Sequence, residues 1–493
     1  MLEMILTIVL TLGLILVVLL CTNKRNQSFP PSPRALPIIG HIHLVGKKLP
    51  HEYLFRLAKQ HGGLMYLQLG RIKTLVASTP AAAEEVLKTH DRAFASRPAN
   101  SAAKYFGYDA TDLVWAPYGD HWRHLRKICT LEFFITKRVQ MFQPVRKLEM
   151  SMLITELVEA CNQRRPVDMT SRFFQFAFNT MSRMVLNKSI SDASGSESEK
   201  LKEFLNNLNE ASKVGNGLQI GDLIPCLSWA DPKVFRIKWL QTQLVNYLGE
   251  QLQEHKKNRE SHDEVKDFMD VLIAGGVLDD TRIKALTSDM LAAGTDAIAV
   301  TIDWALAELM RNPELMQEVK QELEEVVGSK GTVEEEHIPK LEFLQAIVKE
   351  TLRLHPPAPL LAPHESVESC NIWGYNIPAG TGLLVNAYAL GRDESTWSEA
   401  NKFNPKRFLE TKSDVQVTGQ NFELIPFGSG RRMCPALSMG LTMVHYALAT
   451  MLHTFEWSLP DGKDEVNMKA YFGIVLIREE PLMLVPRLAK SCP

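Results

Sequence analysis

The ten residues FGSGRRMCPA (427–436) place a single cysteine, Cys434, behind two glycines and two arginines. Gly428 and Gly430 permit backbone conformations and close approaches that side chains forbid. Arg432 adds a fixed positive charge, and the apolar run that follows is typical of a helix, whose N-terminal dipole and free N–H groups stabilise a thiolate. A lone cysteine is in most proteins a buried structural thiol, but this setting predicts an anionic sulfur ligand for a soft metal centre.

The seven cysteines of the chain are scattered, without C-x-x-C spacing and without a Cys/His cluster. This pattern argues against both a disulfide framework and a zinc site. With one sulfur ligand, the remaining coordination has to come from a macrocycle, which points to haem. The cysteines are at positions 21, 129, 161, 226, 370, 434 and 492.

The composition is that of a globular protein, with 493 residues of which 45% are hydrophobic and 23% charged. The formal net charge is −2, so no global field recruits nucleic acid, and we expect no nucleic-acid partner. Any electrostatic partner has to recognise a local patch.

Residues 4–21, MILTIVLTLGLILVVLLC, carry no charge over 18 positions. As a helix they would span roughly 27 Å, close to the hydrocarbon core of a bilayer. Lys24 and Arg25 follow directly, whereas only Glu3 precedes the run, so the positive-inside rule places everything downstream in the cytosol. A cleaved signal peptide is the alternative, but the run is long and lacks a basic n-region and a small-residue cleavage site. We predict a single transmembrane anchor over residues 1–22.

Prolines within residues 23–40 stiffen the backbone and predict a hinge between the anchor and the body of the protein. Residues 41–493 form one predicted domain. Within it, GLMYLQLGRIKTLVAS (63–78) alternates as a hairpin with Gly70 at the turn, and residues 370–388 return to short strands. Most of the rest has apolar residues at three- and four-residue spacing. The predicted fold class is therefore mainly α with small β-sheets.

Phe427, Gly430, Arg432 and Cys434 match the cysteine-ligand loop of the cytochrome P-450 superfamily, F-x-x-G-x-R-x-C-x-G. The last glycine of that pattern is Ala436 here, which adds one methyl group where the following helix approaches the cofactor ring. The resemblance implies the cytochrome P-450 fold, haem b (iron protoporphyrin IX) as cofactor and Cys434 as the axial ligand of its iron. It also implies that Phe427 and Gly430 belong to the cofactor-binding loop.

Further motifs of the family follow in the expected order. Glu350 and Arg353, at i and i+3 on one helix face, match its E-x-x-R; alone they would be a commonplace surface pair. Arg407 in FNPKRF matches the P-x-R-F segment whose arginine locks with that pair. The resemblance gives these three residues a structural role.

The resemblance also supplies contacts to the cofactor. Trp122 and Arg126 in WRHLR match the W-x-x-x-R helix that grips a haem propionate. Arg432 resembles the second propionate partner, and His364 stands where the family usually has a basic residue. The resemblance spans essentially the whole chain and is closest to plant microsomal enzymes.

The family delivers protons from a long helix with the pattern (A/G)-G-x-(D/E)-T-(T/S); here Gly294 and Asp296 match, and Ala297 replaces the alcohol. Thr295 lies roughly 200° around the helix from position 297, and Thr301 lies one turn further on, roughly 6 Å along the axis. We expect Gly294, Asp296, Ala297 and Thr301 to form the catalytic region. Monooxygenation with water or a substrate hydroxyl in the proton relay is favoured. Altered chemistry, such as oxidative coupling, ring formation or isomerisation, is the alternative.

The resemblance implies a haem-thiolate monooxygenase that inserts one oxygen atom from O2 into a small hydrophobic substrate of specialised metabolism. Substrate contacts are expected from residues 105–115, the helix around 290–301, residues 357–363 and the turn at 472–476, which are apolar with aromatics. A phenylpropanoid or flavonoid and a terpenoid both fit. A non-catalytic haem-binding protein is the third hypothesis, and the intact motifs argue against it.

No flavin or nicotinamide motif is present, so the resemblance implies electrons from NADPH through a flavoprotein reductase. We expect the protein to lie in the endoplasmic reticulum membrane, to cross it once and to have its catalytic domain in the cytosol.

The apolar segment 217–232 is either buried core or a second membrane contact. A basic patch that contains one acid, Glu132, is either a reductase docking site or a solvated helix face. Its basic residues are Arg123, Arg126, Lys127, Lys137 and Arg138.

Overall fold

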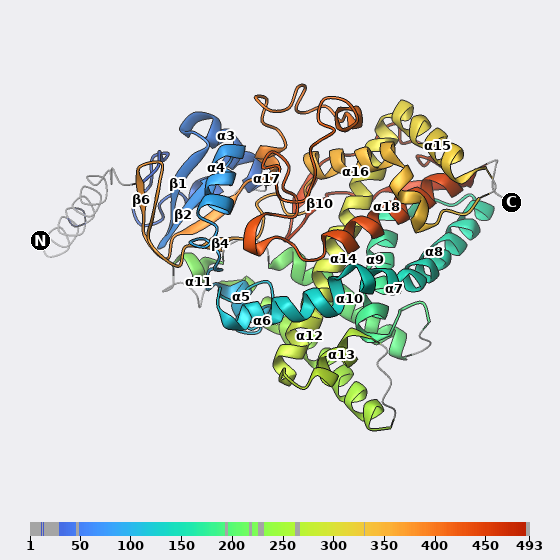
Figure 1. Ribbon diagram of the computed structural model, residues 1–493, viewed down its shortest axis with the longest axis horizontal. Helices are drawn as coiled ribbons and strands as arrows, with labels where there is room; N and C mark the ends of the chain where they lie inside the picture. The colour runs from blue at the N-terminus through green and yellow to red at the C-terminus, as the bar shows by residue number, and fades with distance from the viewer. Residues whose placement is uncertain are drawn as a thin grey trace, which may run out of the picture.

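Figure 1 shows a large helical body beside a smaller lobe built around a sheet. The prediction of a mainly α fold with small sheets is confirmed. Apart from positions 11 and 13, the predicted anchor (1–22) lies outside the described residues, as do residues 23–28 and half of segment 217–232, namely residues 217–218 and 225–230. The computed structural model describes residues 29–45, 49–192, 196–215, 219–224, 231–261, 267–329 and 331–489, with the single positions 11 and 13.

The smaller lobe contains the predicted hairpin. Strands β1 (Leu64–Leu69) and β2 (Ile72–Ala77) pair antiparallel. Gly70 at the turn has φ +56°, and a Cβ there would lie 2.3 Å from the Leu223 carbonyl oxygen, so the turn requires glycine. The lobe also contains the helical segments α2 (Ile42–Val45), α3 (Pro50–His61), α4 (Pro80–Glu84) and η1 (Glu85–Thr89).

The same sheet extends toward the helical body. Strand β2 pairs in parallel with β7 (Gly382–Val385), which pairs antiparallel with β4 (His364–Glu365). Strand β4 is therefore an edge strand, and Figure 1 shows it on the side of the lobe that faces the body. This position brings the predicted site residue His364 to the boundary between lobe and body.

Residues 29–40, the described part of the predicted hinge, lie along β1. The Tyr66 backbone N–H donates to the Pro31 carbonyl at 3.0 Å, and Gly40 pairs with Leu69. The Phe29 ring stacks on Tyr66 with a centroid distance of 4.3 Å. These residues are therefore held by the lobe.

Helix α14 (Asp280–Arg311) runs through the centre of the body (Figure 1). Asp279 caps its first turn, because its carboxylate accepts a hydrogen bond from the Arg282 backbone N–H at 2.8 Å. Among the described residues, α14 alone has the length and hydropathy of a membrane span, but 72% of its most apolar stretch is buried inside the protein. It is the central core helix.

Helix α9 (Met169–Leu186) packs along α14. Met181 of α9 packs directly on α14 at Gly294, where a Cβ would lie 2.7 Å from Met181 Cε. Further along α14, the Trp304 indole N–H donates to the Leu476 carbonyl at 2.8 Å. The other described helices are α5 (Ser101–Tyr105), α6 (Asp120–Cys129), α7 (Thr136–Met141), α8 (Gln143–Gln163), α10 (Ser196–Val214), α11 (Ile220–Leu223), α12 (Pro232–Ser261), α13 (Phe268–Gly275), α15 (Pro313–Val327), α16 (Glu342–Leu354), α17 (Ala387–Leu390) and α18 (Leu437–Thr454), with the short turns η2 (Thr130–Phe134), η4 (Glu335–Lys340), η5 (Pro405–Phe408) and η6 (Gly430–Arg432).

Three smaller sheets complete the described fold. The strands predicted within residues 370–388 are present as β5, β6 and β7, and β5 pairs antiparallel with β6. The strands outside the first sheet are β3 (Val167–Asp168), β5 (Cys370–Ile372), β6 (Tyr375–Ile377), β8 (Phe455–Ser458), β9 (Ala470–Phe472), β10 (Leu476–Arg478) and β11 (Met483–Leu488).

Glu350 and Arg353 on α16 form a buried ion pair rather than a surface pair, and both side chains are 0% exposed. Arg353 Nε and Nη2 donate to the two carboxylate oxygens of Glu350 at 2.6 and 2.7 Å. Arg407, in η5, donates through Nε to Glu350 Oε1 at 3.2 Å. The three residues lie together as the motifs imply.

This cluster also holds the irregular chain that follows α17. Arg353 Nη1 donates to the carbonyls of Gly391 and Ala400, and the Asn404 backbone N–H donates to Glu350 Oε1 at 2.8 Å. Backbone groups without a helix or sheet partner are thus paired with buried charges.

Removing either member of the pair would leave a buried charge without its counter-ion. We expect Glu350→Ala and Arg353→Ala each to lower the free energy of unfolding by about 3–5 kcal/mol and to yield protein without haem. Lys402→Ala is the control, because Lys402 and Glu399 share the i, i+3 spacing but are 64% and 65% exposed, and exposed pairs contribute about 0–1 kcal/mol. Urea unfolding measures the difference. Equal stability of Glu350→Ala and Lys402→Ala would contradict the structural role.

Candidate active site

The loop that carries Cys434 lies between η6 and α18. The Cys434 backbone N–H donates to the Phe427 carbonyl at 2.8 Å, which closes the loop. Gly430 has φ +66°, and a Cβ there would lie 2.6 Å from the Leu87 carbonyl oxygen. The loop and η1 of the smaller lobe therefore meet so closely that only glycine fits at position 430.

The Cys434 thiol lines the main cavity of the protein. Burial raises its pKa, whereas a hydrogen bond from the Ala436 backbone N–H and the charge of Arg126 favour the thiolate. Because burial dominates, a bare thiolate would be disfavoured, and a metal cation bound to the sulfur would stabilise it. The change from glycine to Ala436 leaves the backbone donor in place.

Among the described residues, four arginines line the same cavity: Arg71, Arg97, Arg126 and Arg432. Arg432 donates through Nε and Nη2 to the carbonyls of Ala95 and Ala116, at 2.6 and 2.5 Å. Its Nη1 is buried and has no hydrogen-bond partner within the described part of the chain. A buried guanidinium donor of this kind calls for an anionic acceptor that the described chain does not supply.

Sequence reasoning missed Arg97. Its side chain is buried, and it donates through Nε to the Val114 carbonyl at 3.1 Å and through Nη1 to the carbonyls of Ala362 and Pro363 at 2.8 Å each. No motif marks this arginine, and the only signal is one charge within the stretch FASRPANSAA. Its position depends on chain segments more than 250 residues apart.

Trp122 and His364 also line the cavity, but the Trp122 indole N–H and His364 Nδ1 are engaged by backbone. The Trp122 indole N–H donates to the Leu113 carbonyl at 3.2 Å, and its ring lies 4.2 Å from the Arg432 guanidinium carbon. His364 Nδ1 lies 2.8 Å from a backbone carbonyl. Burial, together with the charge of Arg97, lowers the pKa of His364 to about 3. His364 is therefore neutral, and Arg97 supplies the cation at this place.

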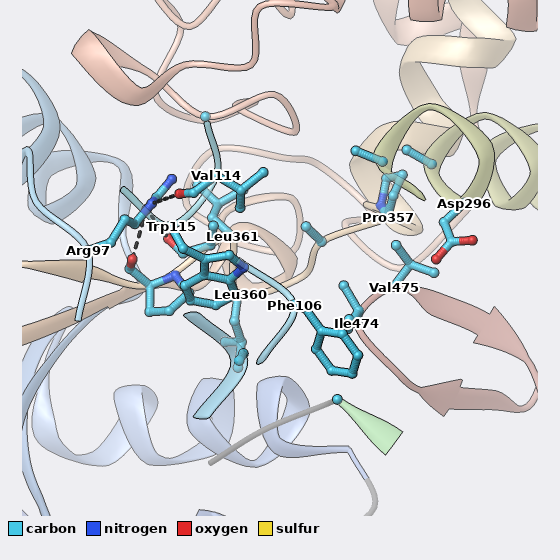
Figure 2. A pocket seen from close by; sticks show the side chains of 18 of the residues that line it. Arg97, Phe106, Val114, Trp115, Asp296, Pro357, Leu360, Leu361, Ile474 and Val475 are labelled. Carbon is cyan, nitrogen blue, oxygen red and sulfur yellow. Dashed lines mark hydrogen bonds between the residues drawn. The ribbon is translucent and has the colours of Figure 1, made fainter. Parts of the chain in front are cut away.

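A cavity of about 1610 Å³ extends from Cys434 between the lobe and the body. All four segments expected to contact substrate contribute to its wall. Sequence reasoning missed the contribution of α10, which adds Leu208 and Ser212. In Figure 2, Arg97 and Asp296 lie at opposite sides of the view, with Trp115 and Phe106 between them. The wall includes Phe106 and Trp115 from the first segment, Ala293 and Thr301 from α14, Leu360 and Leu361 from the third segment, and Phe472 and Val475 from the fourth.

Asp296 places a carboxyl group in the wall of this otherwise largely apolar chamber. Burial raises its pKa to about 6, and a hydrogen bond with Ser212 of α10 offsets part of that effect. Figure 2 shows the carboxyl group beside Val475. A group with a pKa near the working pH can both take up and release a proton, so Asp296 is suited to proton transfer.

Ala297 lines the cavity without an alcohol, and the neighbouring threonines do not replace it. The Thr301 hydroxyl donates to the Ala297 carbonyl at 2.7 Å, and the Thr295 hydroxyl donates to the Leu291 carbonyl at 2.6 Å. Both hydroxyl protons are therefore bound to the backbone of α14. The four predicted catalytic residues Gly294, Asp296, Ala297 and Thr301 line the same cavity.

These features fit haem b. Cys434 would hold the iron, and the free N–H groups of Arg432, with Arg126, would hold the propionates. When bound, the haem supplies the activation of O2. The chain itself supplies the sulfur ligand, apolar walls that exclude water, and a carboxyl group at Asp296 that can hold or release a proton.

Comparisons with known proteins match this description. The family model described as "Cytochrome P450" covers residues 30–485. Flavonoid 3'-monooxygenase of Arabidopsis thaliana is 39% identical over 98% of this chain and 96% of that protein. Costunolide synthase of Cichorium intybus is 38% identical over 94% of each. A solved structure of a zebra fish cytochrome P-450 with progesterone has a TM-score of 0.77 at 25% identity, covering 89% of this chain and 99% of that one. Since the family model and these relatives match nearly the whole chain, this protein belongs to the cytochrome P-450 family.

Proposed function

We propose that this cytochrome P-450 monooxygenase hydroxylates a compact, largely apolar molecule of the flavonoid or terpenoid class in plant specialised metabolism. The observation that carries the proposal is the cavity on Cys434, whose wall consists mostly of aliphatic and aromatic side chains. The names of relatives point to the same two classes: flavonoid 3'-monooxygenase, costunolide synthase and germacrene A hydroxylase.

The cavity wall supports a substrate with one polar end. Trp115 and Phe106 offer flat apolar surfaces to a ring system (Figure 2). Asp296 and Ser212 form a polar site at another part of the wall, where a hydroxyl group of the substrate would find a partner. A substrate without any polar group would add no partner to the one that Ser212 provides for this buried carboxyl group.

Oxygen insertion is favoured over the other reactions considered for this chain. Relatives of 37–39% identity are named as a monooxygenase, a synthase and a hydroxylase. The buried Glu350, Arg353 and Arg407 cluster is intact, which argues against a decayed haem-binding protein. The only observation that would favour oxidative coupling or isomerisation is the absence of an alcohol at Ala297.

Electrons reach members of this family from a redox partner, and an NADPH-dependent flavoprotein reductase is the partner we assign. Lys127 and Lys137 are exposed on α6 and α7 and have no acidic partner within the described residues. Arg123 and Arg138 are paired with Asp120 and Glu132. Arg126 lines the cavity instead. An acidic reductase surface fits the exposed lysines.

We place the protein in the endoplasmic reticulum membrane, with residues 1–22 as its anchor and the remainder in the cytosol. The support is the uncharged run at 4–21 and the basic pair that follows it. The sequence predicts a hinge over residues 23–40. Residues 29–40 lie along the lobe, so we propose the hinge for residues 23–28, where its support is the sequence alone.

Turnover with a panel of compounds tests the function. The full-length chain, assayed in membranes with NADPH and a plant reductase, is expected to add the mass of one oxygen atom to a flavonoid or a terpenoid. Cys434→Ser should abolish both turnover and the carbon monoxide band of thiolate-bound haem. Cys370→Ser is the matched control, a second half-buried thiol, and should retain both. Products of unchanged mass, or dimers of the substrate, would reject hydroxylation.

Deleting residues 1–22 tests the location. We expect the shortened chain to move from the membrane fraction to the soluble fraction and to keep its carbon monoxide band, because the cavity is built only from residues beyond 41. Sedimentation followed by immunoblotting measures the distribution. Retention of the shortened chain in membranes would show that another segment, such as 217–232, holds it there.

Ala297→Thr tests how protons reach the site. If water or a substrate hydroxyl completes the relay, the added hydroxyl should leave the product unchanged and raise the ratio of product formed to NADPH consumed. Ala297→Val is the control, because it has nearly the same shape without the hydroxyl. A different product from Ala297→Thr, but not from Ala297→Val, would show that the enzyme exploits the missing alcohol.

A further inference from the structure

Residues 112–116 form a segment whose backbone carbonyls hold three side chains of the cavity. The Leu113 carbonyl accepts from the Trp122 indole at 3.2 Å. The Val114 carbonyl accepts from Arg97 Nε at 3.1 Å, and the Ala116 carbonyl accepts from Arg432 Nη2 at 2.5 Å. The direction of each of these side chains therefore depends on where this one segment lies.

The backbone N–H groups of the same segment are held by two carboxyl groups. The Leu113 N–H donates to Asp289 Oδ2 at 2.8 Å, and the Trp115 N–H donates to Asp112 Oδ1 at 3.0 Å. Asp289 belongs to α14, so it ties the segment to the core helix. Asp112 is 1% exposed, and its Oδ2 has no donor within the described part of the chain.

The two carboxyl groups face each other. Burial, and then the charge of Asp289, raises the pKa of Asp112, and burial also raises the pKa of Asp289. The Leu113 and Val114 N–H groups favour the ionised form of Asp289. Two carboxylates this close in a dry site cannot both ionise at low cost. One proton, carried on Asp112 and donated to Asp289, satisfies the orphaned Oδ2.

The groups around the pair are consistent with one shared proton. Arg97 and Arg432 are the cations that interact with Asp112. The Tyr108 phenol and the Cys129 thiol also face the pair, and burial raises the pKa of each, so both are neutral. The pair therefore has one negative charge between two cations and two neutral groups.

The chain just before the segment is strained. Tyr108, Asp109 and Ala110 are three consecutive residues with φ of 51°, 57° and 59°. Non-glycine residues visit this left-handed region singly, and a run of three persists only where surrounding contacts hold it. Tyr108 is buried against the carboxyl pair. The strained turn therefore needs the anchor that the pair supplies.

We propose that Asp112 and Asp289 are positioning residues that share one proton and, through residues 112–116, hold Trp122, Arg97 and Arg432 in place for haem. The proposal concerns retention of the cofactor, so it does not depend on the substrate class proposed above. It implies that loss of the shared proton releases the segment from α14 and loosens the grip on haem.

The direction of the pH effect follows from the chemistry. Since the pKa of Asp112 is raised in the folded protein, its stabilising contribution is fully present below the pKa of an exposed aspartate. That contribution is lost as the pH rises through the raised value. We therefore expect the full-length holoenzyme to lose Soret absorbance and to melt at lower temperature as the pH is raised from neutral to alkaline.

Asp112→Asn is the decisive variant, because its amide can accept from the Trp115 N–H and donate to Asp289 without a titrating proton. We expect it to bind haem as the unmodified chain does at neutral pH and to retain haem at alkaline pH. Asp112→Leu, which can neither donate nor accept, should lose haem at every pH. Asp120→Asn is the control, an aspartate that is 97% exposed on α6, and should behave as the unmodified chain.

Two results would overturn the proposal. One is the same alkaline loss of haem in Asp112→Asn as in the unmodified chain, since the titrating group would then lie elsewhere. The other is loss of haem from Asp112→Asn at neutral pH, since a charge on Asp112 and not a proton would then be required. Asp112→Asn retains the shape of the side chain, so the test does not depend on the folding of Asp112→Leu.

Discussion

Glu350 and Arg353 carry opposite charges and have no contact with solvent. Their polar atoms therefore have to find all of their hydrogen-bond partners in each other and in the surrounding chain. Arg353 does so by also donating to the carbonyls of Gly391 and Ala400. The chain between α17 and the Cys434 loop has little regular structure, so these bonds replace a sheet or helix in fixing its path. The path of the irregular chain from Gly391 to Arg407, which leads toward the Cys434 loop, thus depends on a charge pair on a different helix.

Buried positive charge is also present at the cavity, on Arg97 and Arg432. Burial lowers the pKa of Arg432 to about 9 and that of Arg97 to about 10, and both remain cations at neutral pH. Their backbone contacts orient them but do not neutralise them, because a carbonyl is only a dipole. The carboxyl pair of Asp112 and Asp289 supplies one negative charge for these two cations. One buried positive charge beside the apolar chamber therefore still lacks an anion among the described residues, which is costly. The chain is therefore arranged for a ligand that has negative groups on one edge and is otherwise apolar, as haem is.

Residues in motifs of fixed spacing could be predicted from the sequence, because their partners lie on the same helix or in a short loop. Glu350, Arg353 and the Cys434 loop belong to this group, as does the hairpin around Gly70. Arg97, Asp112, Asp289 and Ser212 could not be predicted, since each has a partner on a segment distant in the chain and no motif of fixed spacing marks it. His364 shows that a match to a family position does not establish the charge of the residue. The family usually has a basic residue there, but burial beside Arg97 makes the His364 ring neutral.

The missing alcohol at Ala297 gains meaning from the other side chains of α14. Gly294 has no side chain and packs against Met181. The hydroxyl groups of Thr295 and Thr301 donate to backbone carbonyls of the helix. Asp296 is then the group of this turn that can exchange a proton with the chamber, and it is held by Ser212 on α10. A carboxyl group with a pKa of about 6 can serve as donor at neutral pH, but it needs a bridge to the reacting oxygen. Water or a hydroxyl group of the substrate has to form that bridge. A substrate that brings its own hydroxyl group would make the alcohol of the helix dispensable, which accounts both for its absence and for the polar site in an apolar chamber.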